Sequence, residues 1–217
     1  MTEPSLDAAL DEMPIFPLPR VVFFPDTLLP LHVFEPRYRA MLAHCLATHR
    51  AMVVVRTRPD GAMNADGAPE VESIAGAGIV IEHEQLRDGR SNLVLAGRAR
   101  VRLVELPFVA PFRRARCTIL PPVPSPVSDV ERASLVAAAT SFVREIRKRD
   151  EAFHFALPDG ADAAALADAC AAHLVVDADS RQRALEELDE AKRIRFVTRE
   201  LALQETAFRD REKRTLH

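Results

Sequence analysis

A cluster of prolines constrains this fold more than any other feature, because four of the six residues from 121 to 126 are proline. Proline has no amide hydrogen to donate and cannot continue a helix, so this stretch is expected to be extended and exposed. Short apolar stretches separated by turn residues precede it, and apolar residues at helical spacing follow it. We predict an α+β chain with a β-rich lobe over 13–120, a proline-rich linker over 121–128, a helical bundle over 129–208, and flexible termini over 1–12 and 209–217.

The first half has the pattern of a set of short strands. Six prolines lie between Met13 and Pro36, and prolines within strands belong at sheet edges and bends. Strands over 74–86 and 93–106 flank the turn signal Asp88-Gly89, which predicts a β-hairpin. Further elements are expected as strands over 51–55 and 112–120 and a short helix over 37–48. Many short strands joined by turns are typical of a compact barrel or sandwich.

The second half carries clear helix boundaries. Ser128 and Glu131 have the spacing of a capping box, which predicts a helix that begins there and ends near Arg149. An alanine-rich helix is expected over 161–174. Asp179 is a candidate N-cap for a last helix, and the apolar spacing predicts that this helix runs without interruption over 180–208. At 1.5 Å per residue it would be about 43 Å long.

Composition excludes several classes of protein. The chain has 29 basic and 32 acidic residues, and its net charge of −3 does not indicate a nucleic-acid or membrane partner. No lysine follows a glycine, so the chain lacks the Gly-Lys pair of a phosphate-binding loop, and this excludes an ATPase of that class. Three cysteines without Cys-x-x-Cys spacing favour neither disulfides nor structural zinc. The N-terminal residues are acidic, and no apolar run approaches the ~20 residues of a membrane span. We therefore expect a cytoplasmic protein with no membrane partner and no cofactor.

Two proline–aromatic phrases carry a resemblance to a known family. They read Ile15-Phe16-Pro17-Leu18-Pro19-Arg20-Val21-Val22-Phe23-Phe24-Pro25 and Leu29-Pro30-Leu31-His32-Val33-Phe34-Glu35-Pro36-Arg37-Tyr38. Together they resemble the opening of the Lon protease N-terminal (substrate-binding) domain. Similar segments at 88–90, 97–101, 111–112, 166–174 and 181–186 extend the resemblance over about 13–205. It implies a PUA-like pseudo-barrel followed by a helical bundle with a long last helix.

The resemblance also implies a function. Lon proteases continue into ATPase and peptidase modules, and this chain resembles a free-standing member of the family without them. We therefore expect a protein that is not an enzyme and that binds unfolded or peptide segments of other proteins in a groove between its two halves. An ATP-dependent protease is a further expected partner. Two alternatives stay open: a small-molecule or nucleic-acid binder on the PUA-like lobe, and an adaptor that docks to a separate ATP-dependent protease through the last helix. Nucleic acid is disfavoured because no stacking aromatic residues are interleaved with the basic ones.

The phrase that contains Phe34, Glu35, Pro36, Arg37 and Tyr38 is the most distinctive in the chain. It could form a docking surface, or it could set the direction of the chain. We favour the structural role, in which Phe34 and Tyr38 anchor the core. Glu35 would then lie at the start of a helix, where a negative charge is favourable.

A stretch rich in arginine is the second candidate. Between residues 85 and 120, eight arginines and two acidic residues give a local charge of +6. Apolar and basic residues alternate along the second hairpin arm: Leu93, Leu95, Val101 and Leu103 against Arg98, Arg100 and Arg102. We expect the apolar set on one buried face and the arginines on one exposed face. These arginines and Arg113 are candidate partner-binding residues, because guanidinium groups suit carboxylates and phosphates. The alternative is a solvated face paired with acidic residues of the second half.

Catalytic and metal-binding arrangements find little support. Cys45 and His49 share a helix face at ligand spacing, but two ligands do not make a metal site, and we expect a buried cysteine. His83 and Glu84 are neighbours on a strand and point to opposite faces, so they do not form an acid–base pair. Ser91 lies in a hairpin and lacks the strand-to-helix turn of a serine hydrolase. We predict no catalytic residue and no metal ligand.

Overall fold

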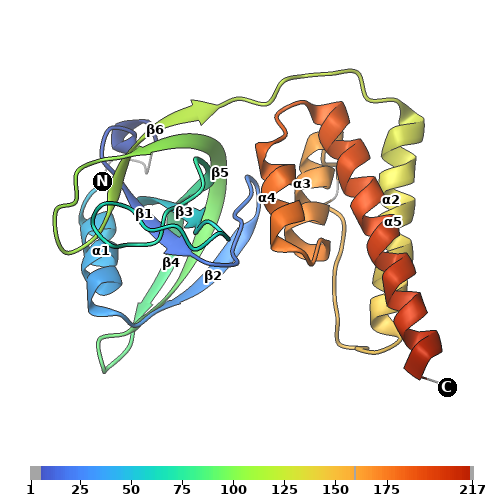
Figure 1. Ribbon diagram of the computed structural model, residues 1–217, viewed down its shortest axis with the longest axis horizontal. Coiled ribbons are helices and arrows are strands. Elements are labelled where there is room, and N and C mark those ends of the chain that lie inside the picture. Colours follow the sequence, from blue (N-terminus) through green and yellow to red (C-terminus); the bar gives the residue numbers. More distant parts are fainter. Residues whose placement is uncertain (1–5, 159, 216–217) are drawn as a thin grey trace. The chain divides into compact units, whose positions relative to one another are not determined.

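Figure 1 shows the computed structural model, which describes residues 6–158 and 160–215. These residues form two compact units, the β unit, which ends at Pro121, and the helical unit, which begins at Pro122. The β unit contains the 3₁₀ helix η1 (Asp7–Ala9), the strands β1 (Met13–Leu18) and β2 (Leu28–Val33), the helix α1 (Pro36–Ala47), and the strands β3 (Ala51–Arg56), β4 (Ile74–Gln85), β5 (Ser91–Glu105) and β6 (Arg114–Leu120). The helical unit contains α2 (Asp129–Arg147), α3 (Ala163–Leu174), α4 (Ala178–Glu186) and α5 (Glu190–Thr215). The predicted α+β class, with a β-rich lobe followed by a helical bundle, is confirmed.

The strands of the β unit form one mixed sheet in the order β2-β5-β4-β3-β1-β6. Because β6 pairs with β5 as well as with β1, the sheet curls into a nearly closed ring. β2 and β6 follow each other along one edge of β5, so β2 lies outside the ring. In the part of the chain that the structure describes, β5 is the only strand that pairs with β2.

A β-bulge interrupts β5 in its middle. Ala99 pairs with Ala77 and Gly97 pairs with Gly78, so Arg98 is an extra residue without a partner on β4. One extra residue reverses the face on which every later side chain of the strand lies. Alternation that is continuous in the sequence is therefore not continuous in space.

Two core clusters result from this reversal. Leu93 and Leu95 lie in a cluster with the buried residues of α1, whereas Val101 and Leu103 lie in a cluster shared by the five strands of the ring. The expectation that these four residues share one face is therefore wrong, although all four are buried. The sequence hides the reversal because the bulge at Arg98 does not break the alternating pattern.

Gly76 and Gly97 allow the segment that contains Phe23 and Phe24 to cross the sheet at close range. A Cβ at Gly76 would lie 2.1 Å from the carbonyl oxygen of Phe23, and one at Gly97 would lie 2.0 Å from that of Phe24. No side chain fits at such distances, so glycine is required at both positions. Both phenylalanine side chains are buried beside these glycines.

The helical unit is built around α2 and α5, which pack against each other, and α3 packs against both. Its core contains residues at helical spacing on these helices: Leu135, Ala139 and Phe142 on α2, and Ile194, Val197 and Leu201 on α5. This arrangement matches the expected burial of one face of each helix. Within residues 6–158 and 160–215, no helix has both the length and the apolar character that crossing a bilayer requires.

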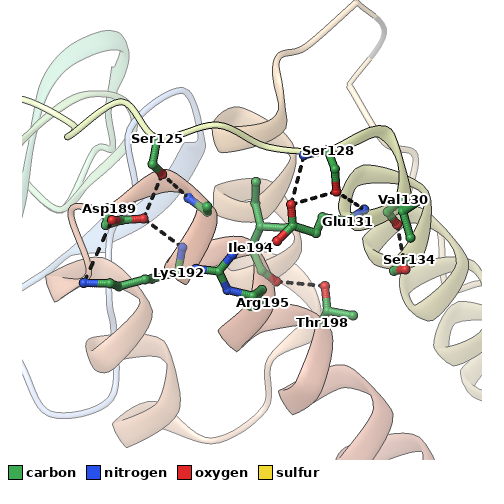
Figure 2. Close-up of polar contacts among 11 residues, drawn as sticks. Ser125, Ser128, Val130, Glu131, Ser134, Asp189, Lys192, Ile194, Arg195 and Thr198 are labelled. Carbon is green, nitrogen blue, oxygen red and sulfur yellow. Dashed lines mark hydrogen bonds and ion pairs between the residues drawn. The ribbon is translucent and has the colours of Figure 1, made fainter.

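The proline-rich segment is tied to the start of α5 (Figure 2). The amide of Val123 donates to the carbonyl oxygen of Leu188 at 2.8 Å. The hydroxyl of Ser125 donates to Oδ1 of Asp189 and accepts from the amide of Ala191, both at 2.8 Å. The segment is thus extended, as expected, and it also satisfies polar groups at a helix start that would otherwise lack partners.

The predicted capping box at the start of α2 is confirmed (Figure 2). The amide of Glu131 donates to Ser128 Oγ at 3.2 Å, and the amide of Ser128 donates to Glu131 Oε2 at 2.9 Å. Arg195 on α5 donates to the other carboxylate oxygen of Glu131 at 2.7 Å. These hydrogen bonds, with that from the Ser128 amide foremost, lower the pKa of the Glu131 carboxyl to about 2. The capping group therefore stays ionised over the neutral range and joins α2 to α5.

The expected uninterrupted last helix over 180–208 is wrong, because two helices occupy this stretch. α4 is capped by Asp177, whose carboxylate accepts from the amide of Ser180 at 2.7 Å, and not by Asp179. α5 then begins at Glu190, where Asp189 accepts from the amide of Lys192 at 2.9 Å. A carboxylate that accepts a hydrogen bond from an amide in the first turn stabilises the start of a helix. Asp189 does this for α5, so a second helix begins where the apolar spacing alone predicts that one helix continues. The long last helix itself is confirmed as α5, with 26 residues.

Candidate functional site

The β unit carries two adjoining surface pockets that share part of their lining. The first has a volume of about 400 Å³ and lies between the end of β1, the end of β2 and the start of α1. The second has a volume of about 300 Å³ and lies between β1, the loop before β4 and the loop between β5 and β6. Both are lined by Pro17, Arg37, Tyr38, Ala68, Pro69 and Arg113. We call the two pockets together the trough.

Most of the trough surface is apolar. The first pocket adds Phe16, Leu18, Leu31, Val33 and Phe34, and the second adds Ile15, Leu106, Phe108, Pro111 and Phe112. Two of these side chains are unusually exposed to solvent for phenylalanine: Phe34 is 59% exposed and Phe108 is 49% exposed. Exposed aromatic residues beside a concave apolar surface are typical of interaction sites.

The exposure of Phe34 corrects one of the expectations for the Phe34–Tyr38 phrase. Tyr38 is buried at 8% exposure, and its ring lies 4.5 Å from the ring of Phe16, so it is the expected core anchor. Phe34 is not one. β2 ends with its buried Val33, and successive residues of an extended chain point to opposite sides, which turns Phe34 outward. The phrase therefore serves both the core and the surface.

Charged residues hold the same phrase in place. Pro36 is the first residue of α1, where proline is favoured because its missing amide hydrogen would have no partner. Glu35 precedes the helix as expected, but its carboxylate makes no capping hydrogen bond and accepts from Arg37 Nε at 2.9 Å. The Arg37 guanidinium carbon lies 4.6 Å from the centre of the Tyr38 ring, an arrangement that favours a cation over an aromatic face. Arg37, which lines both pockets, is thereby held in place.

Arg113 forms the fixed part of the trough wall. Its guanidinium donates to both oxygens of Glu105, at 2.5 and 2.8 Å, and to the carbonyl oxygen of Pro69 at 2.9 Å. With 11% of its side chain exposed, Arg113 joins the end of β5 to the loop that precedes β4. This paired arginine shapes the site and has little charge left for a partner.

The other three candidate arginines lie away from the trough. Arg98 and Arg102 are exposed, but Arg100 is only 4% exposed and its guanidinium carbon lies 5.9 Å from the Phe24 ring. The single exposed face expected for these three is therefore wrong at Arg100. Beyond the bulge at Arg98, Arg100 and Arg102 lie on one face, and Arg100 is buried beside Phe24 while Arg102 stays exposed. Of the four candidate arginines, only Arg113 lines either pocket of the trough.

Sequence reasoning missed the second half of the trough. Phe108 had no assigned role, and the turn-rich loop over 58–69 was expected to flank the groove between the two halves. The loop carried a signal, since the Asn64 side chain accepts from the amides of Asp66 and Ala68 at 3.1 and 2.9 Å, as asparagine does in tight turns. Its position beside β1 depends on Arg113 and could not be read from local pattern.

The residues considered for chemistry have structural contacts. Cys45 is buried, and burial raises the pKa of its thiol to about 12. His83 Nε2 lies 3.2 Å from Ser91 Oγ, whereas Glu84 accepts from Asn92 at 3.2 Å, so His83 and Glu84 have separate partners. Among the described residues, no group of three or more histidines, cysteines or acidic residues is arranged to hold a metal ion.

A nearly closed ring of strands with an apolar trough, followed by a helical bundle, defines a two-part α+β protein. Residues 12–202 match the ATP-dependent protease La (LON) substrate-binding domain. The chain belongs to this family, which confirms the resemblance carried by the two proline–aromatic phrases.

Curated relatives are Lon proteases. The chain is 30% identical over 205 residues to Lon protease 2 of Sorangium cellulosum (strain So ce56), a match that covers 90% of this chain and 25% of that protein. It is 25% identical to Lon protease of Heliobacterium modesticaldum (strain ATCC 51547 / Ice1), over 92% of this chain and 25% of that protein. The chain thus spans about a quarter of the length of these relatives.

Solved structures share the fold. The N-terminal domain of Mycobacterium avium complex Lon protease superposes with a TM-score of 0.63 at 13% identity, covering 88% of this chain and 98% of that one. A Lon N-terminal domain protein from Xanthomonas campestris gives a TM-score of 0.61 at 19% identity, over 85% of this chain and 95% of that one. At these identities the likeness shows the fold alone.

Proposed function

We propose that the chain is a non-catalytic binding protein that holds exposed or unfolded protein segments in the trough of its β unit. The observation that carries the proposal is the pair of exposed phenylalanines, Phe34 and Phe108, on two adjoining apolar pockets. Membership of a substrate-binding domain family supports protein segments as the ligand. The relatives are named Lon proteases, and we propose an ATP-dependent protease as the partner that degrades the bound segments.

The physical basis of binding is the removal of apolar surface from water. Unfolded segments expose the large apolar side chains that folded proteins bury. Full burial of one such side chain contributes roughly 1.5–3 kcal/mol of favourable free energy to binding. Aromatic residues at the centre of an interface contribute most of the affinity. Two adjoining pockets allow one segment to place more than one side chain, which raises the affinity over that of a single contact.

The test is a binding measurement with a permanently unfolded polypeptide. A disulfide-containing protein that has been reduced and carboxymethylated is titrated with the full chain, and the same protein in its folded form is the reference ligand. The unfolded form is expected to bind and the folded form is not. Equal binding of both forms, or of neither, contradicts the proposal.

Substitutions then locate the site. Phe34→Ser and Phe108→Ser are each expected to weaken binding about tenfold, because exposed side chains can be replaced without loss of folding while the interface loses an aromatic contact. Val104→Ser is the matched control, since Val104 is an exposed apolar residue of β5 that lines neither pocket. Circular dichroism verifies that all three variants fold. Equal losses in the three variants would place the binding surface elsewhere.

A further inference from the structure

The edge strand β2 lies between the trough and a third pocket. This third pocket has a volume of about 470 Å³ and is lined by residues of β2, β4 and β5, among them Pro30, His32, Glu82, Glu84 and Asn92. We call it the acidic pocket. Leu31, His32 and Val33 line the first pocket of the trough, so Leu31 and His32 border both pockets. Two pockets of different character thus meet along one short strand.

Burial along β2 divides its side chains between two faces. Leu29 and Leu31 pack against the core cluster that includes α1, and Val33 belongs to that cluster. Pro30 and His32 are exposed. Because side chains alternate along a strand, a neighbouring strand paired with β2 would also send alternate side chains towards these two faces.

The outer edge of β2 is available for such pairing. β5 covers one edge, and no other strand among the described residues pairs with β2. Pro30 lies opposite Val94 of β5, and a proline within a paired strand belongs where its missing amide would face the unpaired edge. Leu28 and His32, two residues away on either side, then face the same edge and offer both a donor and an acceptor.

The acidic pocket has the charge to select a basic side chain. Its lining includes the carboxylates of Glu82 and Glu84 but neither lysine nor arginine. Glu84 accepts a hydrogen bond from Asn92 at 3.2 Å, and Asn92 in turn lies 2.8 Å from His32 Nδ1. Within the part of the chain that the structure describes, neither glutamate forms an ion pair with a basic side chain. A lysine or arginine of a ligand would supply the missing positive charge.

We propose that an extended protein segment pairs with the free edge of β2 as an added strand, with a bulky apolar side chain in the trough and a neighbouring lysine or arginine in the acidic pocket. This inference rests on the proposed function and names the class of segment that is recognised. Main-chain hydrogen bonds supply affinity for any extended segment, and the two pockets select alternation of apolar and basic residues.

The experiment measures fluorescence anisotropy of labelled synthetic peptides with the full chain. The reference peptide alternates leucine and lysine; a second has glutamine in place of every lysine, and a third has the same composition with the two residue types in separate blocks. Two further versions of the reference carry N-methyl groups on every second amide, offset from each other by one residue. Each N-methylated version loses the donors along one edge only, so only one of them is expected to lose pairing with β2.

The structure predicts a defined pattern of affinities. The reference peptide binds at least about tenfold more tightly than the blocked and the glutamine peptides, and one N-methylated version loses binding while the other retains it. The double variant E82Q/E84Q weakens the reference peptide about tenfold and leaves the glutamine peptide unchanged. The matched control E151Q/D210N removes two exposed acidic charges of the helical unit and leaves both peptides unchanged.

Equal effects of the two N-methylation patterns, or an E82Q/E84Q variant that binds the reference peptide as the unsubstituted chain does, overturn the inference. The proposed function survives that result if Phe34→Ser still weakens binding of an unfolded polypeptide. Absence of binding to every unfolded polypeptide and peptide removes both.

Discussion

The Nε atom of Arg193 lies 3.0 Å from Oδ1 of Asp168, and both side chains are almost wholly buried in the helical unit. Asp168 belongs to α3 and Arg193 to α5. Nη1 of Arg193 also donates to the carbonyl oxygen of Glu187 at 2.6 Å, at the end of α4. One arginine therefore joins three helices, and it does so at the break between α4 and α5.

Removal of either partner of this pair is expected to destabilise the helical unit strongly. Arg193→Ala or Asp168→Ala leaves a buried charge without its partner, which costs about 3–5 kcal/mol in the free energy of unfolding. Urea unfolding monitored by circular dichroism measures the loss. Lys192→Ala, at a side chain that is 63% exposed, is the control and is expected to change stability by less than about 0.5 kcal/mol. An Arg193→Ala variant as stable as this control would contradict the assignment.

The hydroxyl of Ser125 is expected to stabilise the start of α5 (Figure 2). Ser125→Ala removes an acceptor for the Ala191 amide and a donor to Asp189. A lost helix cap of this kind costs about 0.5–2 kcal/mol. Ser134→Ala is the control within the same unit, because that hydroxyl donates to the Val130 carbonyl oxygen one turn earlier on an exposed face. Equal unfolding midpoints for the two variants would show that the proline-rich segment does not support α5.

A methyl group at Gly76 is expected to unfold part of the β unit. Gly76→Ala places a carbon 2.1 Å from a backbone oxygen, and backbone cannot move aside as a flexible side chain does. Gly61→Ala is the comparison, since its Cβ would meet no atom within 4 Å and its cost arises only from a φ of +72°. That strain is worth about 1–2 kcal/mol. Thermal unfolding should show a clearly larger loss for Gly76→Ala, and similar losses would contradict the close crossing.

Acid is expected to weaken the helical unit through His173. Burial lowers the pKa of this histidine below its ordinary 6.5, and its ring lies 5.9 Å from the ring of Phe155. The unfolded chain then binds the proton more readily than the folded one, so the stabilising contribution is present above the ordinary pKa and is lost as the pH falls from that pKa through the lowered one. The urea midpoint is expected to fall between about pH 8 and pH 5.

His173→Gln should reduce this fall in the urea midpoint without abolishing it, because the pKa of His44 in the β unit is also lowered, chiefly by burial and then by Arg114. The profile of the variant is measured over the same range in the same buffer series. A pH profile identical to that of the unsubstituted chain would exclude His173 as a source.

The three thiols are expected to be unreactive in the folded chain. Burial raises the pKa of Cys45, Cys117 and Cys170 to about 12 in each case. The thiolate is the reactive form, so modification by a thiol reagent near pH 8 should be slow without denaturant and fast in its presence. Rapid modification of any of the three under native conditions would show an opening that the buried positions do not predict.

Much of the secondary structure followed from local chemistry. The capping box at Ser128, the proline at the start of α1 and the hairpin turn at Asp88-Gly89 act over a few residues, and each appears at the predicted place. The same local reasoning failed between Glu186 and Glu190, where the apolar spacing continues but a capping carboxylate starts a new helix. The apolar spacing favours one helix and the capping carboxylate favours two. The contacts that Arg193 makes at this break come from the tertiary structure, and the sequence does not show them.

The site was less predictable than the fold. The Phe34–Tyr38 phrase was a candidate docking surface, but a structural role was favoured for it. The direction of Phe34 depended on where β2 ends, and the second pocket depended on a loop held by Arg113. Arg100 was expected on the surface and is buried beside Phe24, which comes from a distant part of the chain. These errors concern the orientation of two side chains and the position of one loop.

The sequence by itself determined the β-rich half, the helical half that follows it and the family, because prolines, caps and turn residues act on their immediate neighbours. Only the tertiary structure decided which strand became the unpaired edge, which apolar residues joined which core, and where two pockets met. Those outcomes depend on pairing between residues far apart in the chain, and no local pattern specifies that pairing.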